Sequence, residues 1–469
     1  MGEWAESASA LTKLGARLQV LAFRVITAAV DAGSPAIRFG IGHAVRRRLL
    51  QRPLLSLTAD QTDGGGASAR AGSSEPRAVQ PVVILVTRAL GTGGVEAIVA
   101  TLAQGLPSQG LDCIVLCEQG GSTADALRAL RIPVIEARDE PAALAPLLQE
   151  PSVLAAQLHN APEHLIAACA ARGIPLLPVI HTTDINLSAD DWMRQSDLFD
   201  RSAAVIAVSE TVREFTEHHL PRPTPVPVTV VPNGVAARVF RDARSARERL
   251  GTLIGTELAE TTVFACLARY DMQKNIPGLV RAFLSAVSEG VDAHLIVAGP
   301  VGDWLEYSHA DAIRRSHPRS ARVHLLGSSS SADILDAADA FVLDSFFEGW
   351  PVAASEAVMT GLPLVISDVG GARELAGVAA SRGVICANPG GAPATITLPQ
   401  IRSARRGREQ VNAEALAAEL RTICCDIAGW RSRRERLALD ATQWLGADVM
   451  VAAHARLLHG VQTTAEDAR

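Results

Sequence analysis

Two consecutive strand–loop–helix units between residues 339 and 375 constrain the fold more than any other stretch of the sequence. Asp339–Leu343 is a mostly apolar run with the length of a buried strand, and Leu364–Ile366 is a second such run. Between them, Pro351 suits the first turn of a helix, because its missing N–H would have had no partner there. Gly361 favours a left-handed cap that ends this helix. Short buried strands that alternate with helices predict a parallel sheet of the α/β class.

Two glutamates follow the first of these strands, Glu348 in the loop and Glu356 in the helix. A glutamate on a helix surface is most often solvated, so the spacing of the two residues alone carries little weight. However, the pair flanks Gly349, Trp350 and Pro351 at the carboxyl end of a parallel strand, which is where open α/β sheets bind ligands. We therefore expect a ligand-binding site at this loop.

The segment closely resembles the Glu-x7-Glu motif of retaining glycosyltransferases of family 4, which have the GT-B fold. That fold consists of two Rossmann-like α/β domains that face each other across a cleft. The resemblance implies that Glu348 is catalytic and binds the donor sugar together with Gly349–Pro351, and that Glu356 holds the nucleotide ribose. Carboxylates suit both roles, because their hydrogen bonds to hydroxyl groups are charge-assisted and directional.

Two basic residues, Arg269 and Lys274, lie in the loop that leaves the predicted strand Thr262–Leu267, and a helix should begin near Pro277. Two cations at a helix N-terminus suit a diphosphate, because their charges add to the helix dipole and to its free N–H groups. Family 4 enzymes bind the donor diphosphate with an Arg and a Lys at this spacing, so the resemblance gives these residues that role; a solvated pair is the alternative. Asn275 replaces the glycine most often found after the Lys, a departure that concerns the shape of the loop.

Three glycines are further candidates for residues that line the binding site. Gly299 follows the next strand and would lie near the nucleotide base. Gly93 and Gly94 follow a strand at Val82–Val86, in a loop that makes a poor dinucleotide fingerprint because Glu96 occupies the third glycine position. This loop instead resembles the Gly-Gly-x-Glu opening of the family, where glycines let the backbone approach the cleft. An ordinary turn between a strand and a helix is the alternative.

Two histidines end predicted strands in the first half of the chain: His159 closes Val153–His159, and His181 follows Leu176–Ile180. A single histidine at a strand end is more often structural than catalytic. Family members commonly place a histidine here, facing the donor sugar and the acceptor, so the resemblance favours His181 as a catalytic residue over His159. No Asp-x-Asp metal motif stands at the predicted binding site. We therefore expect no metal and no cofactor besides a nucleotide-diphosphate sugar as co-substrate.

Residues 1–57 differ from the rest, because Leu11–Val30 predicts an amphipathic helix and a basic cluster follows at Arg46–Arg52. The predicted helix carries three cations beside its apolar stripe: Lys13, Arg17 and Arg24. Basic amphipathic helices bind anionic membrane surfaces. The alternative is a helix docked on its own catalytic domain with solvated arginines. Both interpretations stay open.

Composition and motifs divide the chain into five parts. These are a basic amphipathic helical extension (1–57), a Gly/Ser-rich flexible linker (58–80), an N-terminal Rossmann-like acceptor domain (81–234), a C-terminal Rossmann-like nucleotide-sugar domain (235–430) and a helix that crosses back to the N-terminal domain (431–469). The last helix is predicted over Arg434–Leu458. Asn388–Gly407 looks like an insertion, for which a solvated surface loop is favoured over a mobile loop near the acceptor.

A formal net charge of −6 gives no support to nucleic acid as a partner. Seven cysteines without a Cys-x-x-Cys pair predict a reduced, cytoplasmic protein. No uncharged apolar run reaches the ~20 residues that span a bilayer. We expect a cytoplasmic enzyme, peripheral on the inner membrane face if residues 1–57 bind lipid.

The resemblance implies a retaining, hexosyltransferase-type enzyme that moves a sugar from a nucleotide-diphosphate sugar to a glycan or lipid-linked acceptor in envelope or exopolysaccharide synthesis. One alternative is a GT-B enzyme of other chemistry, such as a sugar-phosphate synthase or a nucleotide-sugar epimerase. The other is a non-catalytic GT-B scaffold recruited to the membrane. The presence of both cations and both glutamates argues against the scaffold.

Overall fold

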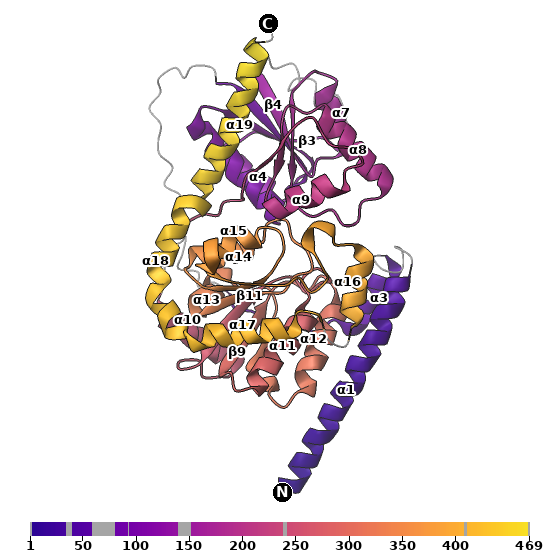
Figure 1. The fold of residues 1–469 in the computed structure, drawn as a ribbon, viewed down its shortest axis with the longest axis vertical. Coiled ribbons are helices and arrows are strands. Elements are labelled where there is room, and N and C mark those ends of the chain that lie inside the picture. The colour runs from indigo at the N-terminus through magenta and orange to yellow at the C-terminus, as the bar shows by residue number, and fades with distance from the viewer. Residues whose placement is uncertain are drawn as a thin grey trace. The chain divides into compact units, whose positions relative to one another are not determined.

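The computed structural model describes residues 2–33, 40–58, 80–91, 93–138, 152–237, 242–407 and 410–467. The chain divides into two compact units (Figure 1). Unit 1 combines Met1–Gln61 with Arg238–Ala441, and unit 2 combines Thr62–Ala237 with Thr442–Arg469. Most of the predicted linker, residues 59–79, lies outside the described residues.

Unit 1 contains a six-stranded sheet in the order β10-β9-β8-β11-β12-β13, with parallel pairing throughout its described strands. Its strands are β8 (Thr262–Leu267), β9 (Ala293–Ala298), β10 (Val323–Leu326), β11 (Ala340–Leu343), β12 (Leu364–Ser367) and β13 (Gly383–Cys386). The helices of unit 1 include α10 (Ala243–Ile254), which precedes β8, and α11 (Ile276–Ser288), α12 (Trp304–Ser316), α13 (Ser331–Ala337), α14 (Val352–Met359), α15 (Ala372–Ala376) and α17 (Ala413–Cys425). All side chains of β9, β11 and β12 are buried, as expected of parallel strands covered on both faces. The order of the strands reverses between β8 and β11, which makes the ends of these two strands a ligand-binding position.

Unit 2 contains a seven-stranded parallel sheet in the order β3-β2-β1-β4-β5-β6-β7. Its strands are β1 (Val82–Ala89), β2 (Asp112–Gln119), β3 (Val134–Glu136), β4 (Val153–His159), β5 (Leu176–Ile180), β6 (Val205–Ala207) and β7 (Val228–Val230). Its helices include α4 (Gly94–Gly105), α5 (Ser122–Ala129), α7 (Glu163–Ala170), α8 (Ala189–Asp200) and α9 (Glu210–His219). The predicted fold class, with two Rossmann-like parallel sheets, is confirmed.

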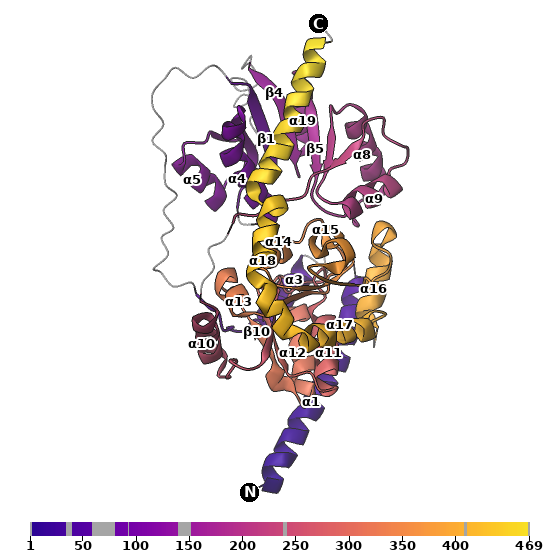
Figure 2. The same ribbon diagram turned by 60° about the vertical axis from the view of Figure 1, so that its left-hand side comes forward.

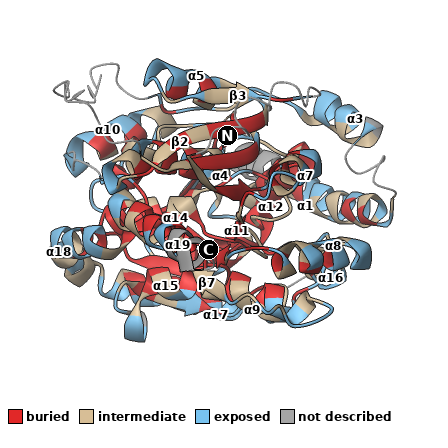
Figure 3. Ribbon diagram, turned by 90° about the horizontal axis from the view of Figure 1, so that it is seen from above, coloured by how far each residue is buried: buried red, intermediate tan, exposed pale blue. Residues whose placement is uncertain are grey.

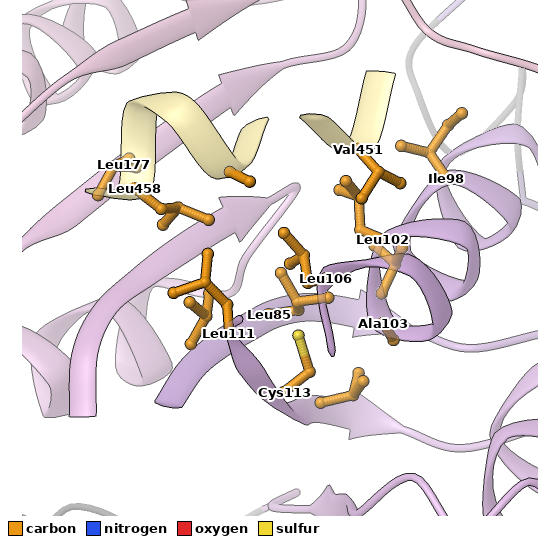
Figure 4. Close-up of a cluster of buried hydrophobic side chains, with 14 of the residues drawn as sticks. Leu85, Ile98, Leu102, Ala103, Leu106, Leu111, Cys113, Leu177, Val451 and Leu458 are labelled. Carbon is orange, nitrogen blue, oxygen red and sulfur yellow. The ribbon is translucent and has the colours of Figure 1, made fainter. Parts of the chain in front are cut away.

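The C-terminal segment forms two helices rather than the one predicted over Arg434–Leu458: α18 (Ile427–Leu445) and α19 (Ala447–Asp467). The helix is interrupted because its backbone pairs with another segment at Gly446. Val235 N–H donates to Leu445 O at 2.9 Å, and Ala447 N–H donates to Val235 O at 3.0 Å. Within unit 2, α19 lies along the sheet (Figures 1 and 2). Its apolar side chains complete a core with the sheet and α4, as the neighbours of Val451 and Leu458 in Figure 4 show.

The N-terminal helices α1 (Gly2–Ala32) and α3 (Ile41–Leu50) are docked on unit 1, where both contact α12. The chain after α3 is also bound, since Leu55 O and Leu57 O each accept a backbone hydrogen bond of 2.7 Å from the β10–α13 loop. Among the arginines of this extension, the Arg46 side chain is only 12% exposed and lies 3.7 Å from the Asp303 carboxylate, whereas Arg52 is 43% exposed and lies 2.7 Å from the buried Asp311 carboxylate. None of the helices in the described part of the chain combines the length and apolarity that a membrane crossing requires.

The segment Asn388–Gly407 differs from the predicted solvated loop, because it contains the packed helix α16 (Leu398–Arg406). Ile401 is fully buried, and the Arg405 side chain is only 8% exposed. Arg405 lies between two buried carboxylates, Asp31 of α1 at 2.8 Å and Glu306 of α12. The segment therefore joins the N-terminal helix to unit 1.

Candidate active site

Two loops of unit 1, residues 268–275 after β8 and residues 344–351 after β11, lie side by side because their strands are neighbours in the sheet. Phe346 N–H donates to Gln273 O at 2.9 Å, and the Gln273 side-chain amide donates to Phe347 O at the same distance. Neighbouring parallel strands end at the same edge of a sheet, so the fold joins two sequence motifs whose residues Lys274 and Glu348 are 74 positions apart.

Glu348 is the centre of this pair of loops. Its carboxylate is buried and accepts from three side chains: Lys274 Nζ at 2.5 Å, Ser345 Oγ at 2.7 Å and Gln273 Nε2 at 3.0 Å. The family resemblance predicts that Lys274 binds the diphosphate and that Glu348 binds the sugar; in the structure the two side chains are in direct contact. A ligand that carries both a phosphate and a hydroxyl group could therefore engage the two residues together.

Arg269 differs from Lys274 in its exposure, with a side chain that is 55% exposed against 18% for Lys274. Its guanidinium pairs with Asp271, and the same carboxylate accepts from Lys274 N–H at 3.2 Å. Asp271 thus links the two predicted diphosphate residues. Between them, the buried Tyr270 hydroxyl lies 2.9 Å from Val297 O and 2.8 Å from Leu326 O, and this anchors the loop to the strand ends.

Asn275 has a left-handed backbone conformation with φ of 50°, which explains why this residue can stand where the family most often has glycine. Its side-chain amide donates to Asp344 Oδ2 at 2.8 Å and exchanges hydrogen bonds with Gln410. Asn412 donates to the other oxygen of Asp344 at 2.7 Å. Burial raises the pKa of Asp344 to about 7, although the amide donors of Asn412 and Asn275 favour its ionised form.

The Gly349–Pro351 segment packs closely against a glycine pair that follows β12. Gly370 has φ of 43°, and a Cβ on it would lie 2.3 Å from Gly349 O. A Cβ on Gly371 would lie 2.2 Å from the Trp350 ring. Trp350 is buried, and its indole N–H donates to Ser355 Oγ at 2.7 Å. This hydrogen bond attaches the loop to α14.

Glu356 and Gly299 border the same two loops. Glu356 lies on α14 and is half-buried. Gly299 ends β9, and a Cβ there would lie 2.2 Å from Ala268 O. Glycine is therefore needed at this position for the β8 loop to approach β9, whatever ligand binds nearby.

The remaining predicted site residues belong to unit 2. Gly93 and Gly94 begin α4 and are exposed. His159 Nδ1 and His181 Nε2 lie 2.9 Å apart at the ends of β4 and β5, and both rings are buried. Since one nitrogen of such a pair must donate and the other accept, the tautomers of the two rings are linked.

Burial keeps these histidines neutral. It lowers the pKa of His181 to about 3, with a smaller contribution from His454, and lowers the pKa of His159 well below its ordinary value. His454 of α19 lies 3.1 Å from the Gln157 amide and has its pKa lowered to about 4 by burial. This buried cluster can therefore offer hydrogen bonds but no positive charge near neutral pH.

Within the described ranges, no group of three or more His, Cys, Asp or Glu side chains is arranged to hold a metal ion.

Comparison with known proteins identifies related sequences for both halves of the chain. A model of Glycosyltransferase Family 4 matches residues 92–238, and a model of Glycosyl transferases group 1 matches residues 256–395. The chain is 25% identical over 293 residues to the UDP-Gal:alpha-D-GlcNAc-diphosphoundecaprenol alpha-1,3-galactosyltransferase of Escherichia coli, which covers 57% of this chain and 74% of that protein. It is 27% identical over 244 residues to the N-acetyl-alpha-D-glucosaminyl L-malate synthase of Bacillus anthracis, covering 50% of this chain and 61% of that protein.

Solved structures agree with this fold. The complex of Anabaena HepE with UDP superposes with a TM-score of 0.63 at 17% identity, over 81% of this chain and 100% of that chain. The lipopolysaccharide outer core galactosyltransferase WaaB gives a TM-score of 0.54 at 14% identity, over 81% of this chain and 99% of that chain. At these identities the likeness concerns the fold alone, and it confirms the predicted GT-B fold.

Proposed function

Because the chain belongs to glycosyltransferase family 4, we propose that it transfers a sugar from a nucleotide-diphosphate sugar to a glycan or lipid-linked acceptor, with retention of the anomeric configuration. The observation that carries this proposal is the contact between Lys274 and Glu348 at the ends of β8 and β11. It joins a cation suited to phosphate and a carboxylate suited to sugar hydroxyls in one partly buried site.

In the proposed mechanism, Lys274 and Arg269 neutralise the diphosphate leaving group as the glycosidic bond breaks. Such electrostatic stabilisation is effective where water is excluded, and the Lys274 side chain is only 18% exposed. Glu348 and the backbone of Gly349–Pro351 orient the sugar, and Glu356 binds the ribose. His181 is neutral and so serves as a hydrogen-bond partner of a sugar hydroxyl rather than as a cation.

The proposed donor is a UDP-sugar, and the proposed acceptor is a lipid-linked saccharide in envelope polysaccharide synthesis. Support comes from the E. coli relative, whose name gives UDP-Gal as donor and a diphosphoundecaprenol-linked GlcNAc as acceptor, and from the UDP complex of HepE. An acceptor of this kind would be reached at a membrane surface. We accordingly propose a cytoplasmic enzyme that binds the inner membrane face through residues 1–57.

A donor screen tests this proposal. UDP, GDP and ADP sugars are added to the full chain, and the rise in melting temperature is measured, followed by calorimetry of the best donor. A stabilising donor that binds the wild type but not Lys274→Ala supports the site. Absence of binding by every nucleotide sugar would favour the scaffold alternative.

Product analysis separates the enzyme alternatives. NMR of the product from a lipid-linked or glycan acceptor should show the anomeric configuration of the donor. An inverted product would exclude the proposed mechanism, and transfer only to a sugar phosphate would favour the synthase alternative.

A further inference from the structure

The N-terminal helix α1 is docked in an unusual orientation: Phe23 lies beside His309 of α12, but a stripe of large apolar side chains points away from the protein. Its stripe consists of four residues, with exposures of 53% for Leu14, 60% for Leu18, 58% for Leu21 and 70% for Val25. The fully buried residues on the face toward unit 1 are small or polar, namely Ala16, Thr27 and Asp31, and Phe23 beside them is half-buried. An amphipathic helix on a globular domain normally buries its apolar face. We call the four exposed residues the α1 stripe.

Polar contacts fix this orientation. The Arg405 guanidinium, itself almost fully buried, binds Asp31 at 2.8 Å and also binds Glu306 of α12. Arg315 of α12 donates to the Gln19 side chain at 2.8 Å. Rotation of α1 to bury its stripe would remove Asp31 from Arg405 and Gln19 from Arg315, at the cost of a buried charge that has lost a partner. The α1 stripe therefore stays on the outside while α1 is docked.

Exposed arginines accompany the apolar side chains. Arg17 lies within the length of the α1 stripe, and α3 exposes Arg47 and Arg48 beside Leu49, which is 77% exposed. Both helices contact α12, and their outward faces are exposed in Figure 3. Residues 1–52 hold eight Lys and Arg against three acids, a net charge of +5, whereas the whole chain carries −6. The apolar surface thus belongs to the basic part of an acidic protein.

We propose that the α1 stripe and the exposed arginines of α1 and α3 form a surface that inserts into the headgroup region of an anionic lipid bilayer while α1 remains docked on α12. Apolar side chains would enter the acyl boundary, and arginines would bind lipid phosphates. The purpose that we give to this surface, which is to bring the enzyme to a lipid-linked acceptor, rests on the proposed function. Membrane binding itself does not depend on turnover.

A second copy of the chain is the main competing partner, because the stripe has the alternating spacing of four and three residues of a coiled-coil seam. The flanking positions argue against it. Arg17 and Arg24 occupy one flank, and Gly15 and Ala22 occupy the other, so paired helices would lack oppositely charged partners across the seam. Anionic headgroups supply the opposite charge on every side.

Sedimentation with vesicles tests the proposal. The full chain is mixed with phosphatidylglycerol-containing vesicles or with pure phosphatidylcholine vesicles, at low and at high salt. We expect binding to the anionic vesicles that weakens with salt, and at least about tenfold weaker binding to phosphatidylcholine. Equal binding to both lipids, or no binding to either, would overturn it.

Two variants and a control localise the surface. Leu18→Glu/Leu21→Glu should reduce vesicle binding about a hundredfold or more, and Arg47→Gln/Arg48→Gln about tenfold. Leu130→Glu/Met193→Glu adds the same charges at exposed apolar positions of unit 2 and should bind like the wild type. Because the replaced leucines are exposed, melting temperature and donor binding should not change in the stripe variant. Unchanged vesicle binding by that variant would refute the assignment.

The rival partner and the proposed function give different outcomes. If analytical ultracentrifugation shows a dimer that the stripe variant converts to a monomer, without vesicle binding by the wild type, the stripe is an interface between copies. Vesicle binding without any donor binding would leave this surface standing and overturn the proposed function. Donor turnover with a soluble acceptor but no vesicle binding would overturn this surface, and with it the proposed membrane attachment, but would leave the proposed sugar transfer standing.

Discussion

The two groups of predicted site residues, one in each unit, differ in how they hold charge. In unit 1, Lys274 and Glu348 are ionic partners 2.5 Å apart in loops that solvent partly reaches. In unit 2, His159 and His181 form a buried hydrogen-bonded pair whose pKa values are lowered. In the loops of unit 1, a charged group of a ligand can therefore take the place of one partner of the Lys274–Glu348 ion pair. The neutral histidine pair in unit 2 instead suits an uncharged hydroxyl group.

The largest effect should come from Glu348→Gln, which keeps the side-chain volume but removes the charge. We expect kcat to fall by roughly 10²–10³-fold, because the group proposed to orient the sugar loses its charge-assisted bonds. Steady-state rates with the donor identified by the screen measure this loss. Glu136→Gln is the matched control, since it breaks a surface ion pair with Arg128 that has a similar length of 2.6 Å.

The control variant should retain wild-type turnover. If Glu348→Gln also retains it, Glu348 has only a structural role and the comparison between the two units loses its basis.

Lys274→Ala should weaken donor binding by ~2–5 kcal/mol, because removal of a charge from a partly desolvated phosphate site leaves the ligand anion without its partner. Lys13→Ala removes the same charge from α1 and should leave donor affinity unchanged. Isothermal calorimetry on both variants measures the difference. Similar affinities in Lys274→Ala and the wild type would place the diphosphate elsewhere.

Two buried groups, His454 and Asp344, should make opposite contributions to the pH dependence of stability. Burial lowers the pKa of His454 in unit 2 to about 4 in the folded protein. As the pH falls below 6.5, His454 is therefore protonated in the unfolded chain but not in the folded protein, and the free energy of unfolding decreases until about pH 4. One such histidine contributes a loss of roughly 3 kcal/mol over that range. Asp344 in unit 1 has a raised pKa of about 7, so its burial costs stability as the pH rises from 3.8 to 7.

Urea unfolding from about pH 4 to 7, followed in the wild type and His454→Gln, measures the first effect. The variant should lose less stability than the wild type on acidification. An identical pH dependence of the two proteins would show that His454 is not kept neutral by the fold.

Much of the framework could be predicted from the sequence, because buried parallel strands are continuous apolar runs bounded by turn residues. The predicted limits of β4, β5 and β8 agree with the structure to the residue. The neighbouring positions of the β8 and β11 loops follow from the strand order that the structure shows. What makes Lys274 and Glu348 partners, however, is the register of two loops, which no local pattern encodes.

Other features of the structure depend on tertiary contacts, and no pattern in the sequence predicts them. Gln273 and Ser345 are ordinary polar loop residues in the sequence, yet both donate to Glu348. The break at Gly446 arises from pairing with Val235, far away in the chain. Helical periodicity found the α1 stripe but could not show that Arg405 holds the opposite face of α1 against unit 1.

The smallest predicted effect concerns Asn275, which replaces the glycine that the family most often has at this position. Its left-handed backbone favours glycine, but its amide also binds the buried Asp344 carboxylate at 2.8 Å. Asn275→Gly should keep the backbone conformation and lose that hydrogen bond, whereas Asn275→Ala should lose the bond and also strain the backbone. We therefore expect Asn275→Ala to be less stable than Asn275→Gly by about 1 kcal/mol, and both to be less stable than the wild type. Thermal unfolding of the three proteins measures this order. If Asn275→Gly equals the wild type, the bond to Asp344 contributes nothing, and only the backbone explains the residue.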